Sequence, residues 1–555
     1  MIVTLMSWSI IFLLSLTLGN IFIRKIMVNT FENTTRLDIY VVAGLMVLDA
    51  YAQIYSILAG VSKMAFCLVT VITGFLFLFL LADQIKNKKM LKIDFGTPWK
   101  MCIIIALFGV ILLYTIKAPE FVDTYLYHIQ AIRWIEEYGA VPGLGNLHNR
   151  FAYNSAFLPL QALFSFSWVT DPLHTLNGFL GIFFVIYAVM TNHIFTSEDN
   201  TLSDFLKLIV FPYILLNRRT ISSPNTDTLA MLLVLYITIK WCECIEKEEE
   251  IQSYGVLCLF SVWAITVKIS TAACLVFAIL PIFSLLKRHD WKNILKDLII
   301  GIVIISPWFV RNIIISGYLV YPYSGIDLFH VDWKMPAELL DYDRKEIAVY
   351  GREVRDVSKY EDSIVKWFET WFSSQMFRNK LLIVLGFGAS VCLIVILVII
   401  IINCIRNKVL IKTFYLERKN LLLVISILLG ETFWFFSAPL VRYGMVYLMM
   451  PIAVIYFFLE KMMGNILNRY VIVLGTGILV LILLFKNDDF RMVFPQGYWN
   501  MDSNVNNWEG TIIYSSTDDR QLNDYFHFPA VTDKRILNEI EMRGNDLSEG
   551  FRVKE

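Results

Sequence analysis

The sequence has few charged residues. Asp, Glu, Lys and Arg make up 17% of its 555 residues, whereas a soluble domain carries roughly 25%. Hydrophobic residues make up 57% and aromatic residues 15%. This composition predicts a polytopic membrane protein. Lys+Arg and Asp+Glu both number 48, so the chain has no net charge, which argues against nucleic acid as a partner.

Other signals are also missing. The eight cysteines fall in or beside apolar segments, and only Cys242 and Cys244 lie close together, which favours structural thiols over a metal site. No internal repeat or low-complexity tract is visible. No basic segment precedes the first apolar run, and Arg24 and Lys25 follow it. We therefore expect an uncleaved first span whose start lies outside the cytoplasm.

The long apolar runs define the expected topology. A helix needs about 20 apolar residues to cross the hydrocarbon core. Fourteen runs qualify approximately: 3–23, 38–59, 64–82, 101–117, 174–194, 204–217, 226–245, 253–268, 270–286, 297–315, 381–403, 420–436, 443–460 and 470–485. Clusters of Lys and Arg mark the cytoplasmic ends. They agree with one another only if 151–168, which contains polar residues, is a re-entrant or surface helix. Both termini then lie outside.

Two further regions are expected outside. The loop 316–378 alternates aromatic and charged residues, which favours surface helices, and the polar tail 486–555 has one strand-like run at 511–515. The expected fold is an all-α polytopic membrane protein with about fourteen spans and a small soluble tail. We divide it into N-terminal spans (1–100), a central module (101–330) with the outer loop 118–170, an extracytoplasmic loop (331–380), C-terminal spans (381–485) and the tail (486–555).

The segment 117–159 is unusually polar for such a protein. Its part 120–138 has helical spacing: apolar residues form one face, and Asp123, His128, Arg133 and Glu137 lie off it. This pattern is typical of a helix at a membrane surface. Asp123, near the start of that helix, is a candidate catalytic group. Asp123 and His128 are five residues apart, which places them on different faces of an α-helix and argues against a metal shared by these two alone.

Five cations lie on the expected outer side of the membrane, although Lys and Arg usually mark the cytoplasmic side. Ionisable residues in or near spans usually face a cavity or a partner. Together with Asp123 and Asp227 they predict an outward polar cavity able to hold a phosphate. The cations are Arg218, Arg219, Lys268, Arg311 and Arg442.

Each of these residues has a simpler interpretation. A single cation could snorkel or pair with a nearby acid. Asp123 could only cap the surface helix, and Asp227, which follows Ser222–Asn225, could be a helix N-cap. His128 and His148 could be solvated or hydrogen-bonded histidines.

Several patches resemble the GT-C superfamily of polytopic glycosyltransferases, which use polyprenyl-linked sugar donors. VDTYLYHIQAIRWIEEYGAVP resembles the first outer loop of that family, and NSAFLPLQALFSF the segment after it. SSPNTDTLAMLLVLY resembles its second loop, AITVKISTA its Lys-containing turn, and PWFVRNIIISGYLVYP the stretch before its larger outer loop. The likeness covers roughly residues 100–330. It is nearest to uncharacterised bacterial members and more distant from the aminoarabinose and protein mannosyl transferases. Departures include Thr124 after Asp123, and Lys268-Ile-Ser in place of Lys-Gly-Pro.

The resemblance implies roles for individual residues. Asp123 would be the general base, and Asp227 would orient the acceptor or, with Asp123, help to hold a divalent cation such as Mg²⁺ or Mn²⁺. Lys268 would hold the donor phosphate, with Arg218, Arg219, Arg311 and Arg442 as further candidates. The implied substrate-binding residues are Tyr127, His128, His148, Arg150 and Asn154.

The expected function is transfer of a sugar from a polyprenyl-phosphate carrier to an envelope glycan, lipid or protein on the outer face of a bacterial inner membrane. One alternative is a polysaccharide polymerase or ligase. Another is a transporter or flippase of lipid-linked sugars, for which pseudo-symmetric halves would be expected. The absence of a repeat and the outer position of the charges favour the enzyme.

Overall fold

The protein is built around a bundle of long helices. A computed structural model describes residues 1–27, 37–86, 97–195, 200–247, 254–407, 411–463, 496–517 and 520–554. Within these residues, ten stretches are long and apolar enough to cross a membrane. They comprise α1 (Ile2–Ile21) with the π-helical η1 (Phe22–Ile26), α2 (Leu37–Leu58), α3 (Lys63–Lys86), α4 (Pro98–Thr115), α11 (Asp227–Glu246), the 3₁₀ segment η7 (Ile269–Ala278) with α13 (Ile279–Lys287), α14 (Trp291–Ser316), α17 (Phe377–Asn407), α18 (Ile411–Ser437) and α19 (Val441–Met463). The chain is a multi-pass integral membrane protein.

These ten stretches match ten of the fourteen expected spans. Two more expected spans are shorter apolar helices, α8 (Leu176–Met190) and α12 (Gly255–Val267). The run 204–217 forms two helices, α9 (Leu202–Leu208) and α10 (Val210–Leu216). A proline ring clashes with the carbonyl four residues earlier, so Pro212 accounts for the end of α9 at Leu208. The expected span 470–485 lies outside the described residues.

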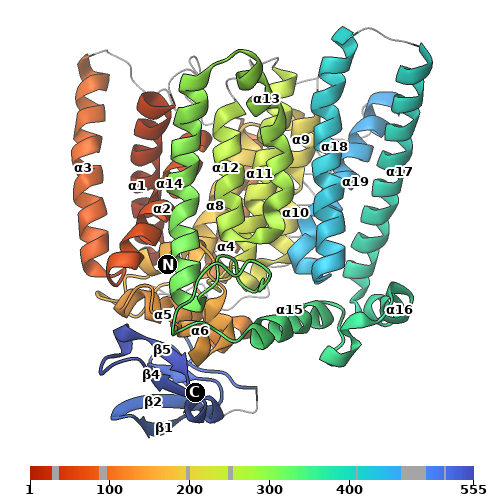
Figure 1. The fold of residues 1–555 in the computed structure, drawn as a ribbon. Coiled ribbons are helices and arrows are strands. Elements are labelled where there is room, and N and C mark those ends of the chain that lie inside the picture. Colours follow the sequence, from red (N-terminus) through yellow and green to blue (C-terminus); the bar gives the residue numbers. More distant parts are fainter. Residues whose placement is uncertain are drawn as a thin grey trace.

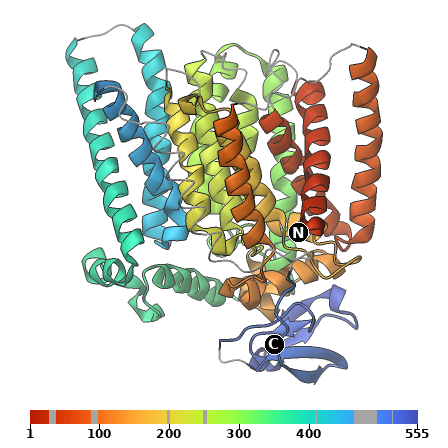
Figure 2. The same cartoon turned by 180° about the vertical axis from the view of Figure 1, so that it is seen from behind.

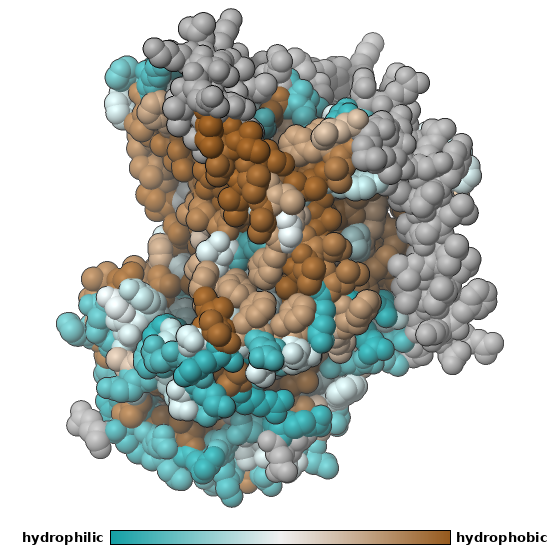
Figure 3. Space-filling view, turned by 90° about the vertical axis from the view of Figure 1, so that its right-hand side faces the viewer, coloured by the Kyte–Doolittle hydropathy of each residue, from teal (hydrophilic) through white to brown (hydrophobic). Residues whose placement is uncertain are grey.

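The bundle has one elaborate end, here called the loop end. Figure 1 shows α5 (Ile129–Glu137), α6 (Leu144–Leu147), α15 (Ala337–Gly351), α16 (Ile364–Ser374) and the tail there, and Figure 2 shows both termini at the same end. The expected surface helices of 316–378 are therefore present. On the face shown in Figure 3, the described residues are mostly hydrophobic over the helices and mostly hydrophilic over the loop end, as expected for a lipid-facing band beside a water-facing end.

The segment 151–168 does not cross the bundle. It contains α7 (Phe157–Leu163), whose residues are all buried, and α7 packs against α2 and α5. Because the helix has only seven residues, it could span about 10 Å, far less than a bilayer. Shorter turns also occur at His193–Phe195 (η4) and Val357–Glu361 (η8).

The tail contains strands, so the expected all-α class is wrong for this part. In one sheet β1 (Ser503–Trp508) is antiparallel to β2 (Thr511–Ser516), and β3 (Ala530–Val531) is parallel to β2. In the other, β4 (Ile540–Met542) pairs antiparallel with β5 (Phe551–Val553). Two turns accompany them, η9 (Lys534–Asn538) and η10 (Leu547–Glu549). β2 coincides with the expected strand; β3 to β5 are too short to show alternation.

The tail is docked on the first outer loop. The Gln130 side chain, fully buried on α5, donates to the carbonyls of Asp524 and His527 at 2.6 and 2.9 Å and accepts from the Ala530 amide at 3.1 Å. The Tyr125 ring stacks on Trp499 with centroids 5.0 Å apart. The apolar face expected to meet lipid therefore packs in part against the tail.

Candidate functional site

Four charged side chains from distant segments meet at the loop end. The Arg442 Nη2 lies 2.7 Å from the Asp123 carboxylate, and its Nε lies 3.5 Å from Asp227. Lys268 forms an ion pair with the other oxygen of Asp227. The four side chains are 14–25% exposed, so the cluster is accessible at one side. We call Asp123, Asp227, Lys268 and Arg442 the loop-end cluster.

Breaks in the helices position these side chains. Asp227 is the first residue of α11, where a negative charge is favoured by the helix dipole. Lys268 adopts an extended backbone between α12 and η7, and Arg442 lies in the first turn of α19. Asp123 immediately precedes a π-helical turn, η2 (Thr124–His128). Each charge therefore lies at a helix end, near the bundle surface.

Neither acid acts as a helix cap. The side chain of Asp123 makes no capping hydrogen bond to η2. At α11 the cap is supplied by Asn225, whose Oδ1 accepts from the Thr228 amide at 3.0 Å. The simpler interpretation of both acids as caps is therefore wrong: their carboxylates pair with cations instead.

Aromatic rings enclose the cations. The Arg442 guanidinium lies 4.5 Å from the ring centroid of Phe121 and 4.9 Å from that of Tyr443. The Lys268 ammonium lies 3.5 Å from the Tyr443 centroid. Such contacts stabilise a cation where water is partly excluded.

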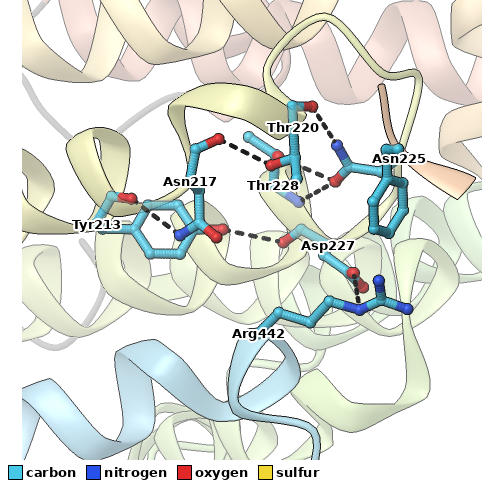
Figure 4. A pocket seen from close by; sticks show the side chains of 8 residues that line it. Tyr213, Asn217, Thr220, Asn225, Asp227, Thr228 and Arg442 are labelled. Atoms are coloured by element: carbon cyan, nitrogen blue, oxygen red, sulfur yellow. Dashed lines mark hydrogen bonds and ion pairs between the residues drawn. The ribbon is translucent and has the colours of Figure 1, made fainter. Parts of the chain in front are cut away.

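A cavity adjoins the cluster. It is small, with room for about one water molecule, and its lining includes Phe121, Tyr213, Asn217, Asp227 and Arg442. Figure 4 shows Asp227 and Arg442 pointing toward each other across one side of this cavity. The cluster thus borders a small gap in the packing that is continuous with solvent.

His128 also lies near the cluster, although an α-helix would place it and Asp123 on different faces. The Ile129 amide bonds to the Thr124 carbonyl, a π-type turn. Because this turn spans five residues rather than four, residues five apart lie nearer to one face. The charges of Asp123 and Asp227 act on the His128 ring, and burial lowers the pKa of His128 to about 4.

The other three outer cations do not join the cluster. Arg311 is buried, and it donates to Asn154 Oδ1 at 2.9 Å and to the Ser56 hydroxyl. Arg218 donates to the Tyr114 hydroxyl at 3.2 Å and to the Leu215 carbonyl at 2.9 Å, in the turn η5 (Arg218–Thr220). Arg219 is exposed.

Asn154 belongs to the surroundings of Arg311. Its Oδ1 accepts from Arg311, and its Nδ2 donates to the Trp308 carbonyl at 2.9 Å. Both polar groups of the amide are therefore engaged within the bundle. This arrangement connects α14 to the end of the first outer loop.

Arg150 and His148 lie in a second polar group, between η3 (Asn149–Ala152) and α15. Arg150 pairs with Glu346 at 2.8 Å, and the Tyr321 hydroxyl donates to the buried Asp343 at 2.9 Å. His148 Nδ1 accepts from the Arg150 amide at 2.9 Å, and burial lowers the pKa of His148 to about 3. These contacts hold α15 against the loop.

Sequence reasoning missed Asp343. It is one of many acids in the loop 316–378, and nothing in the spacing marks it. Tyr127 lies beside His128, with ring centroids 4.2 Å apart, and the charge of Arg150 in the second group also acts on it. Burial, followed by the charge of Asp123, raises the pKa of Tyr127 well above its usual value.

Asp123 and Asp227 were also possible metal ligands. In the structure both carboxylates are paired with cations of the chain itself. Among the residues that the structure describes, no group of three His, Cys, Asp or Glu side chains has a geometry that could hold a metal ion.

A family model described as "Domain of unknown function (DUF8201)" matches residues 1–449. The chain belongs to the DUF8201 family. The DUF8201 match includes all four residues of the loop-end cluster and ends within α19, before the tail. No curated protein and no solved structure matches the chain.

Proposed function

We propose that the protein is a membrane glycosyltransferase that moves a sugar from a polyprenyl-phosphate-type carrier to a cell-envelope glycan, lipid or protein. The observation that carries this proposal is the loop-end cluster. Two carboxylates and two cations come from four segments up to 319 residues apart and meet, partly exposed, beside a cavity. A lipid-linked substrate needs such a site at the end of a membrane bundle, where its tail lies among helices and its head group reaches water.

The cluster supplies what the reaction requires. An acceptor oxygen attacks the anomeric carbon of the donor sugar, the new C–O bond forms, and the bond to the phosphate oxygen breaks. The acceptor proton passes to Asp123, and the polyprenyl phosphate leaves with the electron pair. Lys268 and Arg442 stabilise the charge that grows on the leaving phosphate, and Asp227 keeps the two cations in place. A positioned general base contributes about 10²–10⁴-fold.

Arg442 couples donor binding to the base. In this structure its guanidinium is bound to Asp123, so part of the carboxylate is occupied. A donor phosphate would compete for the same guanidinium, and Asp123 would then be free to accept a proton. Because the chain itself supplies two cations, the proposed transfer requires no divalent metal, and addition of EDTA to the assay tests that point.

The proposed location is a bacterial inner membrane with the loop end on the outer face. The basic segments that should be cytoplasmic support this orientation: α13 ends at Lys287, at the end of the bundle opposite α5 and the tail (Figure 1).

The test is a transfer assay in membranes that contain a radiolabelled polyprenyl-phosphate-sugar pool. Asp123→Asn is expected to lower the rate of label transfer by about 10²–10⁴-fold at matched expression. The control is Asp362→Asn, which removes a carboxylate from a surface pair with Lys366. Equal transfer by native and Asp123→Asn protein would remove Asp123 as the base. If the native protein consumed no donor, whichever sugar was offered, the transferase proposal would fail and a transporter would replace it.

A further inference from the structure

The His128 side chain is almost fully enclosed, yet its Nδ1 has no hydrogen-bond partner. The residue is 3% exposed, and Nδ1 is buried among the described residues without an acceptor or donor opposite it. Buried polar atoms are nearly always paired. An unpaired ring nitrogen at this position therefore points to a group that is present only when the site is occupied.

The surroundings of His128 place it beside the loop-end cluster. Its ring stacks on Phe121 with centroids 6.5 Å apart, and Phe121 in turn lies against Arg442 and lines the cavity. The negative charges of Asp123 and Asp227 and the positive charges of Arg442 and Lys268 all act on the ring. His128 thus lies close enough to all four members of the cluster for their charges to act on it.

The imidazole is neutral at physiological pH because burial holds its pKa at about 4. A neutral imidazole has one N–H donor and one bare nitrogen acceptor. Unlike the carboxylates, it has no ion-pair partner to exchange. It is suited to bind a neutral hydroxyl group and poorly suited to bind a phosphate.

We propose that His128 binds the acceptor substrate: its Nδ1 forms a hydrogen bond with an acceptor hydroxyl group and orients the attacking oxygen toward Asp123. This inference rests on the proposed function and assigns the two substrates to different residues of the site. Lys268 and Arg442 hold the anionic donor, and His128 holds the uncharged, hydroxyl-bearing acceptor. His128 takes no proton in the reaction, because the acceptor proton passes to Asp123.

Three substitutions separate this role from a packing role. His128→Asn places an amide where Nδ1 lies, His128→Gln places one nearer the position of Nε2, and His128→Phe keeps the ring without nitrogen. His289→Asn is the matched control, since His289 is exposed at a turn between α13 and α14 and has a positive φ that asparagine tolerates. Each variant is purified, and its thermal unfolding is compared with the native protein.

Two quantities are then measured. The first is transfer of label from the radiolabelled lipid pool to the membrane acceptor fraction. The second is binding of undecaprenyl phosphate, read as the shift that this lipid causes in the unfolding temperature. We expect His128→Phe to lower transfer by about two- to tenfold, the loss of one hydrogen bond between uncharged groups, while lipid binding stays native. His128→Asn should recover most of the transfer, and His128→Gln less.

The outcomes are distinct. Native transfer by His128→Phe would overturn the inference and leave the proposed function intact. If His128→Asn were as inactive as His128→Phe, the ring would be acting as a proton acceptor and the inference would be wrong. Loss of undecaprenyl phosphate binding in His128→Phe would assign the residue to the donor instead. If native protein did not transfer, the proposed function and this inference would fail together.

Discussion

One helix, α11, carries two ion clusters with opposite properties. At its first residue is Asp227 of the loop-end cluster. About 20 Å further along the helix, Lys240 and Glu243 belong to a far-end cluster, together with Lys207 and Asp204 of α9 and Asp38 of α2. Side chains of the loop-end cluster are 14–25% exposed, whereas those of the far-end cluster are 0–10% exposed.

The two clusters also differ in how completely they are paired. Lys207 lies 2.9 Å from Glu243 and donates to the Thr191 carbonyl at 3.1 Å. Lys240 lies 2.9 Å from Glu243 and also pairs with Asp38, which accepts from the Tyr236 hydroxyl at 3.0 Å. At the loop end, by contrast, Arg442 Nε makes no hydrogen bond and lies only within ion-pair distance of Asp227, and Nδ1 of the neighbouring His128 lacks a partner. A closed network holds helices together, while an open one is available to a ligand.

The largest expected effect concerns the far-end cluster. Lys240→Met leaves Asp38 buried without its cation, and removing one partner of a buried pair costs about 3–5 kcal/mol. We expect a much lower unfolding temperature and yield, measured by thermal unfolding in detergent. Lys366→Met, on a surface pair where Lys366 is 69% exposed, is the control. An unchanged unfolding temperature for Lys240→Met would show that the far-end cluster is not structural.

Glu136 is a buried ionisable residue outside both clusters, at the place where the tail docks on α5. Glu136 is 4% exposed and accepts a hydrogen bond from Tyr525, and burial raises its pKa to about 7 from 4.5. The folded protein therefore binds more protons than the unfolded chain between these values. The stability contributed by this proton is complete below pH 4.5 and is lost as the pH rises to about 7.

Glu136→Gln should remove this pH dependence. The shift corresponds to about 3 kcal/mol at most, so the variant should lose less stability than the native protein between pH 4.5 and 7. The measurement is the unfolding temperature across that range, followed by Trp fluorescence. Glu137→Gln serves as the control, because the Glu137 side chain is 50% exposed. If the unfolding temperatures of the native protein and Glu136→Gln changed in parallel with pH, Glu136 would not be the source of the pH dependence.

The smallest expected effect is on the free energy of donor binding, at Lys268. A charge-assisted hydrogen bond contributes about 1.5–3 kcal/mol, so Lys268→Met should raise the donor KM by about 10- to 150-fold. The unfolding temperature should change little, because the Lys268 side chain is 24% exposed. If Lys268→Met lowered the unfolding temperature as far as Lys240→Met does, both clusters would be structural and the proposed difference between them would be wrong.

Much of this arrangement was predictable from the sequence. Apolar runs located ten spans, and cations placed against the orientation trend pointed to Lys268 and Arg442, which do meet Asp123 and Asp227. Arg311 could not be told apart from Lys268 and Arg442 in this way, because a cation near a helix end gives no information about which neighbour it faces. Its partner, Asn154, lies 157 residues away in the chain.

Other features depend on local geometry that sequence patterns do not encode. Apolar spacing in 120–138 fits an α-helix, yet η2 is a π-turn, and this single change moves His128 beside Asp123. Similarly, β4 and β5 have three residues each and are defined by pairing with each other rather than by alternation. The far-end cluster was not predicted either, because its acids and lysines lie near the ends of apolar runs, where charges are ordinary.

The most direct test of the account is to compare Asp227→Asn with Glu243→Gln, two neutralised carboxylates on the same helix. Transfer of label per folded molecule and the unfolding temperature are measured for both. The account predicts that Asp227→Asn folds like the native protein and transfers at least tenfold more slowly, whereas Glu243→Gln unfolds at a lower temperature but transfers normally while folded. The opposite pattern, with Asp227→Asn active and Glu243→Gln stable but inactive, would contradict the assignment of the functional site to the loop end.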